Sequence, residues 1–385
     1  MTDESHAIHV LVPDLPKANA LTPLLERIDK TRRYANSGPL AQAFTQVAAA
    51  LIPATQGANA PPHAVPVASG SAALELALRA HGLPPGAKVL MPALGFPAMA
   101  SAALRCGLVP VFADISPGSW TLTTHMALDA VRAADIALVM PVAAYGHALP
   151  AEDWDEFYER TGIPVIMDAA GAFPWQAVGR NVCVAFSLHA TKPFGIGEGG
   201  LVVTRDDVLA ERVRRLADHG FSHGLVSEPG LNCKMSEFHA AVGLAQAGRI
   251  DGVLAELERV RIAYAERLAP LVGAVSLQRG GTPPRRSLLV MRLHAMAADD
   301  MAAALGRHGI QTRRWYCPPL TAHPAFRHVR LLGPDAVARL PVTDALGPTL
   351  LGLPYHTSLT DADVAEVCAV IERTIAESHP PGDRP

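Results

Sequence analysis

The sequence predicts an α/β protein with a large domain, whose central sheet is mostly parallel and flanked by helices, and a smaller C-terminal α/β domain. Three observations lead to this prediction. Short apolar segments alternate with helical segments, which is the pattern of a sheet with helices on both faces. The chain has 385 residues, more than a single-core domain usually holds. Hydrophobic residues make up 49% of it, which is ample for a buried core.

The elements of the large domain follow from local patterns. Strands are predicted where short apolar runs are bounded by turn residues, at 64–68, 88–91, 109–112, 136–141, 164–167, 182–187 and 200–204. Helices are predicted where Ala- and Leu-rich or amphipathic stretches follow, at 72–81, 97–105, 151–160, 207–218 and 236–247. Gly82 and Gly107 end the first two helices, and a linker-like loop at 55–62 precedes the first strand.

A long amphipathic stretch at 248–268 is predicted to bridge to the second domain, which contains a strand at 287–293 and helices at 299–307 and 361–378. We therefore place the large domain, with an N-terminal arm, at 1–255 and the small domain at 256–385.

Composition excludes several classes of partner. The net charge of -3 and the pI of about 6.6 provide no basic surface for nucleic acid or an anionic membrane. The N-terminus is acidic, unlike a secretory signal, and no apolar run reaches the roughly 18–20 residues that span a bilayer. The five cysteines form no C-x-x-C pair, which indicates reduced thiols. We expect a cytoplasmic protein that binds neither nucleic acid nor membrane and holds no metal.

The segment 183–200 (C-V-A-F-S-L-H-A-T-K-P-F-G-I-G-E-G-G) contains the first candidate for chemistry, Lys192. A lysine amine becomes a nucleophile when desolvation lowers its pKa, and an aldehyde then captures it as an imine. The glycines that follow would allow the backbone close to a bulky ligand. The alternative is a surface lysine in a hairpin turn.

Asp168 follows the apolar run I-P-V-I-M, at the carboxyl end of a predicted strand, where ligands bind in open α/β sheets. A buried carboxylate there needs a cationic partner, such as the protonated pyridine nitrogen of pyridoxal 5'-phosphate (PLP). The alternative is an aspartate that caps a helix N-terminus.

Two further strand-to-helix junctions could contact such a cofactor. The Ser-Gly-Ser turn at 69–71 leaves free N–H groups at a helix start, which suits a phosphate, and Ser71 can add its hydroxyl. Phe96 could stack on a flat ring, although a phenylalanine at this position could also belong to the core.

These segments, in this order, resemble the DegT/DnrJ/EryC1/StrS family of PLP-dependent sugar aminotransferases, which have the fold-type-I aminotransferase fold. The resemblance runs through most of the chain. It rests on Y-A-N-S-G-P-L-A-Q-A-F (34–44), S-G-S-A-A-L-E-L-A-L, L-P-P-G-A-K-V-L-M-P-A-L-G-F, I-M-D-A-A, F-S-L-H-A-T-K, G-E-G-G-L-V-V-T, G-L-N-C-K-M-S-E-F-H-A-A-V-G and W-Y-C-P-P-L.

The resemblance implies a role for each matching residue. Lys192 would form the internal aldimine with PLP and shuttle the proton, and Asp168 would pair with the pyridine nitrogen. Phe96 would stack on the ring. The phosphate would be held by Ser71, the backbone of Ala72 and Ser187. Asn232 would reach the phosphate in the neighbouring subunit, so the resemblance implies a homodimer with shared active sites.

Other matching residues have weaker assignments. His189 lies near the cofactor in relatives, or is a histidine packed at a strand edge. Candidates on the substrate side are Arg313, Arg314, Tyr316 and His323, each of which could instead be packing or solvated charge.

Two positions depart from the family pattern. The family usually has glutamine three residues after the aspartate, contacting the cofactor's ring hydroxyl, and this chain has Gly171 there. Another group must then satisfy that oxygen. The usual G-Y-N-Y-R is G-L-N-C-K here, so Cys233 and Lys234 replace an aromatic residue and an arginine, and Lys234 could be a solvated residue or an anion contact.

We therefore expect an aminotransferase that moves an amino group from glutamate, or glutamine, to a keto group of a nucleotide-linked deoxysugar. One alternative is the same cofactor chemistry on a cyclitol or an aromatic precursor, or a sugar dehydration. The other, of a different class, is a non-catalytic sensor that binds PLP or a sugar nucleotide.

Overall fold

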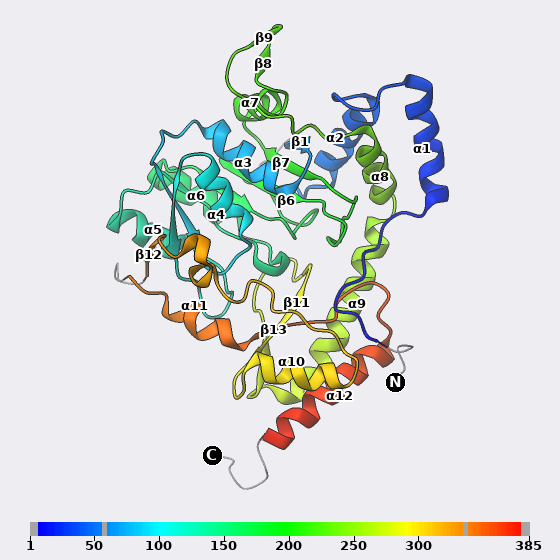
Figure 1. Cartoon of the computed structure of the whole chain (residues 1–385), viewed down its shortest axis with the longest axis vertical. Helices are drawn as coiled ribbons and strands as arrows, with labels where there is room; N and C mark the ends of the chain where they lie inside the picture. Colours follow the sequence, from blue (N-terminus) through cyan, green and yellow to red (C-terminus); the bar gives the residue numbers. More distant parts are fainter. Residues whose placement is uncertain (1–6, 56–59, 334–337, 379–385) are drawn as a thin grey trace.

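The computed structural model describes residues 7–55, 60–333 and 338–378, and its centre is an eight-stranded sheet (Figure 1). The strand order is β1-β7-β6-β5-β4-β2-β3-β12. Their bounds are β1 (His63–Val67), β2 (Lys88–Pro92), β3 (Val109–Ala113), β4 (Leu138–Val139), β5 (Val165–Asp168), β6 (Val182–Ser187), β7 (Gly200–Thr204) and β12 (Arg330–Leu332). In this sheet β7 runs antiparallel to both of its neighbours, and the other pairings are parallel. The predicted mostly parallel sheet is confirmed.

Both faces of this sheet are buried. Along β6, Val182, Val184 and Phe186 belong to one hydrophobic cluster, whereas Cys183 and Ala185 belong to another. This alternation follows from the two-residue period of a strand. One face is covered by α3 (Gly70–His81), α4 (Ala98–Arg105) and α7 (Asp207–Ala217), and the other by α2 (Pro39–Leu51), α5 (Thr124–Ala133), α6 (Ala151–Thr161) and α8 (Glu237–Ala247).

The C-terminal third contains a second, antiparallel sheet, in the order β10-β11-β13. Its strands are β10 (Val275–Leu277), β11 (Leu289–Leu293) and β13 (Leu350–Leu353), and its helices are α10 (Ala298–Arg307), α11 (Pro341–Leu346) and α12 (Asp361–Ser378). The long helix α9 (Ile250–Leu268) runs from the large sheet to this region (Figure 1). The predicted boundary at residue 255 therefore falls inside a helix, and the division into two domains remains a proposal.

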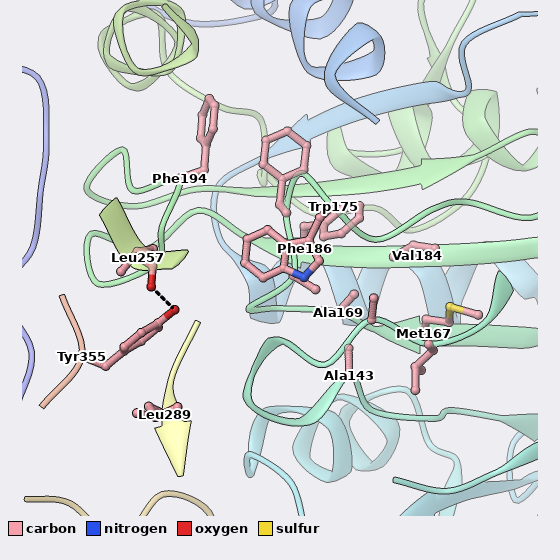
Figure 2. Packing of buried hydrophobic residues seen from close by; sticks show 14 of the residues in the cluster. Ala143, Met167, Ala169, Trp175, Val184, Phe186, Phe194, Leu257, Leu289 and Tyr355 are labelled. Atoms are coloured by element: carbon pink, nitrogen blue, oxygen red, sulfur yellow. Dashed lines mark hydrogen bonds between the residues drawn. The ribbon is translucent and has the colours of Figure 1, made fainter. Parts of the chain in front are cut away.

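The two regions share one hydrophobic cluster. Phe186 from the large sheet, Leu257 from α9 and Leu289 from β11 all belong to it, as Figure 2 shows. The Tyr355 hydroxyl, also in this cluster, donates a hydrogen bond to the Leu257 carbonyl at 2.9 Å. In addition, β12 returns from the C-terminal third to pair with β3. The two regions are therefore tied together by packing and by strand pairing.

Several elements were not predicted. They are α1 (Ala18–Thr31), α2, α5, α11, β10, β12, β13 and the hairpin of β8 (Phe221–Ser222) and β9 (Leu225–Val226), which projects beyond α7 in Figure 1. Of the strand expected at 136–141, only the two residues of β4 form a strand. Part of the loop at 55–62, residues 56–59, lies outside the described residues. Within the described part of the chain, the helices are all too short or too polar to cross a membrane.

Candidate active site

Lys192 lies in the connection between β6 and β7, a hairpin in which the Leu188 N–H donates to the Gly199 carbonyl at 2.9 Å and the Ala190 N–H to the Gly197 carbonyl at 2.7 Å. The backbone at Lys192 therefore forms a hairpin, as the alternative of a surface lysine in a hairpin turn predicted. The side chain does not behave as a surface lysine, however, because burial lowers its pKa and nearby Asp168 only partly opposes this effect.

The hairpin is held in place by the residues that follow the lysine. Phe194 is 1% exposed and packs edge-on against Phe173, with ring centroids 4.9 Å apart (Figure 2 shows its position). A Cβ atom at Gly195 would lie 2.5 Å from the Ala190 carbonyl oxygen, so this turn requires glycine. Lys192 is thus presented from a rigid loop anchored in the core.

Asp168 ends β5 and is 4% exposed. Burial raises the pKa of its carboxyl, and the Ala170 N–H bonded to Oδ1 at 3.1 Å and the charge of Lys192 oppose this rise. The segment that follows is a turn, so Asp168 is not the N-cap of a helix. Asp168 and Lys192 shift each other's pKa, but no hydrogen bond joins them. The carboxylate therefore has no cation from the described residues bonded directly to it.

The start of α3 lies against the ends of β6 and β7. A Cβ atom at Gly70 would lie 2.7 Å from the Ser187 Cβ, and one at Gly200 would lie 2.4 Å from the Ser69 carbonyl oxygen. Both glycines therefore let the helix N-terminus approach Ser187. Ser71 is exposed at this end, whereas the Ala72 N–H already donates to the Ser69 hydroxyl at 3.1 Å and would have to exchange that partner for a phosphate.

Phe96 and Asn232 are both exposed. Phe96 is 58% exposed just before α4, so the alternative of a core phenylalanine is wrong, and its ring is free to stack on a ligand. Asn232 lies beside Asp218, and the neighbouring Cys233 carbonyl accepts the Ala68 N–H at 2.7 Å. These positions are compatible with the roles that the resemblance implies, which remain proposals.

The departure at Lys234 is explained by its partner. Its ammonium group donates to the Asp218 carboxylate, and only 11% of its side chain is exposed. Lys234 is therefore a paired residue, not a solvated one.

Of the substrate-side candidates, the structure brings Tyr316 to the site. Burial raises its pKa, and the charge of Asp168 adds to this effect, so the two groups are close. Its ring stacks on Tyr145, with centroids 4.9 Å apart and planes 17° apart. Both tyrosines have positive φ angles, 60° and 61°. They form an aromatic wall beside Asp168.

The other candidates have partners elsewhere. Arg314 pairs with Asp299 and donates to the Gly347 carbonyl, so the packing interpretation holds for it. The Arg313 guanidinium lies 4.6 Å from the centroid of the Trp315 ring.

The two histidines are both near the surface. His323 contacts the Pro318 carbonyl at 3.3 Å. His189 is exposed and contacts the Thr191 hydroxyl at 2.9 Å, so it is not packed at a strand edge as the alternative held.

Comparison with known proteins identifies the family. Residues 18–372 match the DegT/DnrJ/EryC1/StrS aminotransferase family. The chain belongs to this family. It is 31% identical over 326 residues to GDP-perosamine synthase of Caulobacter vibrioides, covering 81% of this chain and 86% of that protein. It is 28% identical to UDP-2-acetamido-2-deoxy-3-oxo-D-glucuronate aminotransferase of Pseudomonas aeruginosa, covering 80% of this chain and 85% of that protein.

A solved structure supports the same assignment. The structure of DesI in the presence of its TDP-sugar product superposes with a TM-score of 0.83 at 28% identity, covering 97% of this chain and 95% of that chain. The predicted fold-type-I aminotransferase fold is confirmed, and the protein is a PLP-dependent aminotransferase of the DegT/DnrJ/EryC1/StrS family.

The residues present fit this cofactor. Asp168 is a buried carboxylate with no cation hydrogen-bonded to it among the described residues, and a protonated pyridine nitrogen would supply one. The lowered pKa of Lys192 favours the uncharged amine that an aldehyde requires. Gly70 and Gly200 shape a cradle at the start of α3 where a phosphate would meet helix N–H groups.

Tyr145 and Ser287 also belong to this region, and sequence reasoning missed both. Ser287 lines a cavity of ≈ 30 Å³ together with Lys192 and Thr191. The sequence offered one signal for them, the glycine at position 171. It indicated that another residue must contact the ring hydroxyl of the cofactor, but it did not identify that residue.

Proposed function

We propose that this protein transfers an amino group from glutamate, or glutamine, to a keto group of a nucleotide-linked deoxysugar, with PLP attached covalently to Lys192. The observation that carries this proposal is the pairing of a lysine of lowered pKa with a buried carboxylate of raised pKa, both at the carboxyl edge of the parallel strands. PLP, when bound, supplies an electron sink that stabilises negative charge on the substrate carbon.

The protein's own groups then have separate tasks. The Asp168 carboxylate would hold the proton on the pyridine nitrogen, because a buried negative charge favours the protonated ring. The Lys192 amine, when free, would take a proton from one carbon and return it to another. An amine whose pKa is lowered by burial suits this task, since it accepts and releases protons nearer to neutral pH.

The substrate class rests on the relatives. The names of two relatives contain GDP- and UDP-linked sugars, and DesI was solved with a TDP-sugar product. In this chain Tyr316 and Tyr145 form the wall next to Asp168 on which an acceptor would rest. The proposed roles of Arg313, His323 and His189 in substrate binding belong to this proposal as well.

We further propose a cytoplasmic homodimer in which Asn232 reaches the partner's phosphate site. The support is a group of exposed apolar side chains: Phe221, Leu225 and Val226 on the β8–β9 hairpin, exposed by 48%, 74% and 59%, and Phe96 near the active site. Apolar side chains gathered on one hairpin are typical of a surface that a partner covers. Sedimentation of the wild type and of Leu225→Asp would test the dimer, since the charged variant should shift toward monomer.

The first experiment is an absorbance spectrum of the protein with PLP, before and after adding glutamate. We expect a visible band that glutamate bleaches and that Lys192→Ala lacks. In Lys192→Ala the amino-transfer rate should fall by about 10³-fold or more, because the proton carrier is lost. A band that neither glutamate nor glutamine bleaches would contradict the simple aminotransferase and leave a dehydratase or a sensor.

A panel of acceptors then separates the enzymatic alternatives. After bleaching, nucleotide-linked 3-keto and 4-keto sugars should restore the visible band, whereas cyclitol and aromatic keto compounds should not. Restoration only by one of the latter compounds would overturn the proposed substrate class while leaving the cofactor chemistry intact.

A further inference from the structure

Ser287 is a polar residue in a mostly buried position at the active site. Ser287 precedes β11 and is 4% exposed, and its backbone N–H donates to the Tyr145 carbonyl at 2.9 Å. Among the described residues, none forms a hydrogen bond with its side chain. Ser287 and Lys192 line the same cavity, which places Ser287 near a ligand held by that lysine.

The side chain of Ser287 occupies a space created by two glycines. A Cβ atom at Gly171 would lie 2.3 Å from the Ser287 Oγ atom, and a Cβ atom at Gly146 would lie 2.8 Å from it. Real Cβ atoms essentially never approach a neighbour this closely. The Ser287 hydroxyl therefore lies where a side chain at position 171 would begin, so a glutamine at 171 would require this hydroxyl to move.

The sheet order places Ser287 relative to the expected cofactor. The phosphate cradle lies at the ends of β6 and β7, on one side of Asp168, where Ser187 and Gly200 meet the start of α3. Gly171 follows β5, and Gly146 lies beyond β4, on the other side of Asp168 in the strand order β7-β6-β5-β4. On the pyridine ring, the phosphate arm and the ring hydroxyl flank the carbon that carries the aldehyde. If the nitrogen lay at Asp168 and the phosphate at α3, the ring hydroxyl would point to the side of Ser287.

We propose that the Ser287 hydroxyl forms the hydrogen bond to the ring hydroxyl oxygen of PLP, in place of the glutamine that the family usually has at the position of Gly171. This inference rests on the proposed function, because it needs the cofactor at Lys192. It makes Ser287 a cofactor-binding residue contributed by the C-terminal third of the chain. The bond couples the position of β11 to cofactor binding.

The test is a double-mutant cycle read out by PLP affinity and by the visible spectrum of the bound cofactor. Ser287→Ala should raise the PLP dissociation constant of the apoprotein by about 2- to 10-fold, the effect of one hydrogen bond. It should also shift the midpoint of the spectral pH titration, because a hydroxyl that donates to the ring oxygen stabilises its charged form. Ser276→Ala is the matched control, since Ser276 lies on β10 and contacts His294 at 3.0 Å.

The second arm exchanges the two residues. Gly171→Gln alone should weaken PLP binding by more than Ser287→Ala, because the new side chain collides with Ser287. Combining Gly171→Gln with Ser287→Ala should restore the dissociation constant to within a few-fold of the wild type, since the closest contact, with Oγ, is removed and the amide would reach the same oxygen.

Each outcome has a distinct meaning. If Ser287→Ala matches the control in both affinity and titration midpoint, the assignment of Ser287 is wrong, although the proposed function stands. A double variant that binds PLP no better than Gly171→Gln would also overturn it. A wild-type protein that forms no visible band with PLP would overturn both this assignment and the proposed function. Should Gly171→Gln fail to fold, Ser287→Ala still decides the question.

Discussion

The close approach of β7 to the start of α3 can be tested by adding one methyl group at Gly200. A Cβ atom there would lie 2.4 Å from the Ser69 carbonyl oxygen and 2.8 Å from the Gly70 nitrogen. These atoms must move apart by about 0.6 Å before the carbon–oxygen distance reaches 3.0 Å, the lower limit of real Cβ contacts. Strand β7 cannot retreat easily, because Gly200 is paired with Val67 on one side and Ser187 on the other. The start of α3 must therefore give way.

We expect Gly200→Ala to destabilise the apoprotein by about 1–3 kcal/mol, the usual cost of overpacking a buried site. Because α3 is displaced by a substantial fraction of an ångström, the charge-assisted hydrogen bonds from its N–H groups to the phosphate should weaken. One or two such bonds correspond to about a 10- to 100-fold loss of PLP affinity. Fluorescence titration of the apoprotein with PLP measures the affinity, and thermal unfolding measures the stability.

Gly118→Ala is the matched control, because a Cβ atom at Gly118 would meet nothing within 4 Å. It should leave both quantities unchanged. If Gly200→Ala lowers the melting temperature but keeps the PLP affinity of the wild type, the start of α3 does not hold the phosphate. If neither quantity changes, the steric reasoning itself is refuted.

Two further predictions concern other buried polar groups. Glu237 is fully buried and accepts hydrogen bonds from the N–H groups of Leu40 and Ala41 at 2.8 Å each. Glu237→Gln should therefore lower the free energy of unfolding, measured in urea, by about 2–4 kcal/mol. The exposed control, Glu266→Gln, should change it by almost nothing. An equal effect of the two variants would show that Glu237 does not cap α2. Burial, and secondarily the charge of Arg286, lowers the pKa of His147 to about 4 in the folded protein. Between pH 6.5 and 4 the unfolded chain therefore binds a proton at this histidine that the folded protein does not. The free energy of unfolding should fall as the pH falls through this range, by about 2 kcal/mol at pH 5. His147→Gln should flatten this part of the pH profile, and an unchanged slope would contradict the assignment.

Much of the local structure could be predicted from the sequence. The strands at 182–187 and 200–204 and the helix at 361–378 have the predicted bounds, because apolar runs and turn residues report directly on local backbone structure. The missed helix α2 had a local signal, Gly38 followed by Pro39 at its first position, but its stabilising cap comes from Glu237 on α8. The pairing of β12 with β3 had no such signal, because it joins a short segment of the C-terminal third to a strand far away in the chain.

The sequence by itself determined the family and the cofactor, and it predicted Lys192 and Asp168 as the catalytic residues, because this chemistry requires particular residue types in short, ordered motifs. Only the tertiary structure decided what surrounds them. In the structure, burial lowers the pKa of Lys192, the charge of Asp168 acts on Tyr316 whereas Arg314 pairs with Asp299, and Ser287 lies against Gly171. The physical reason is that local patterns record backbone preference and chemistry, whereas burial and contacts between distant segments arise only when the whole chain packs.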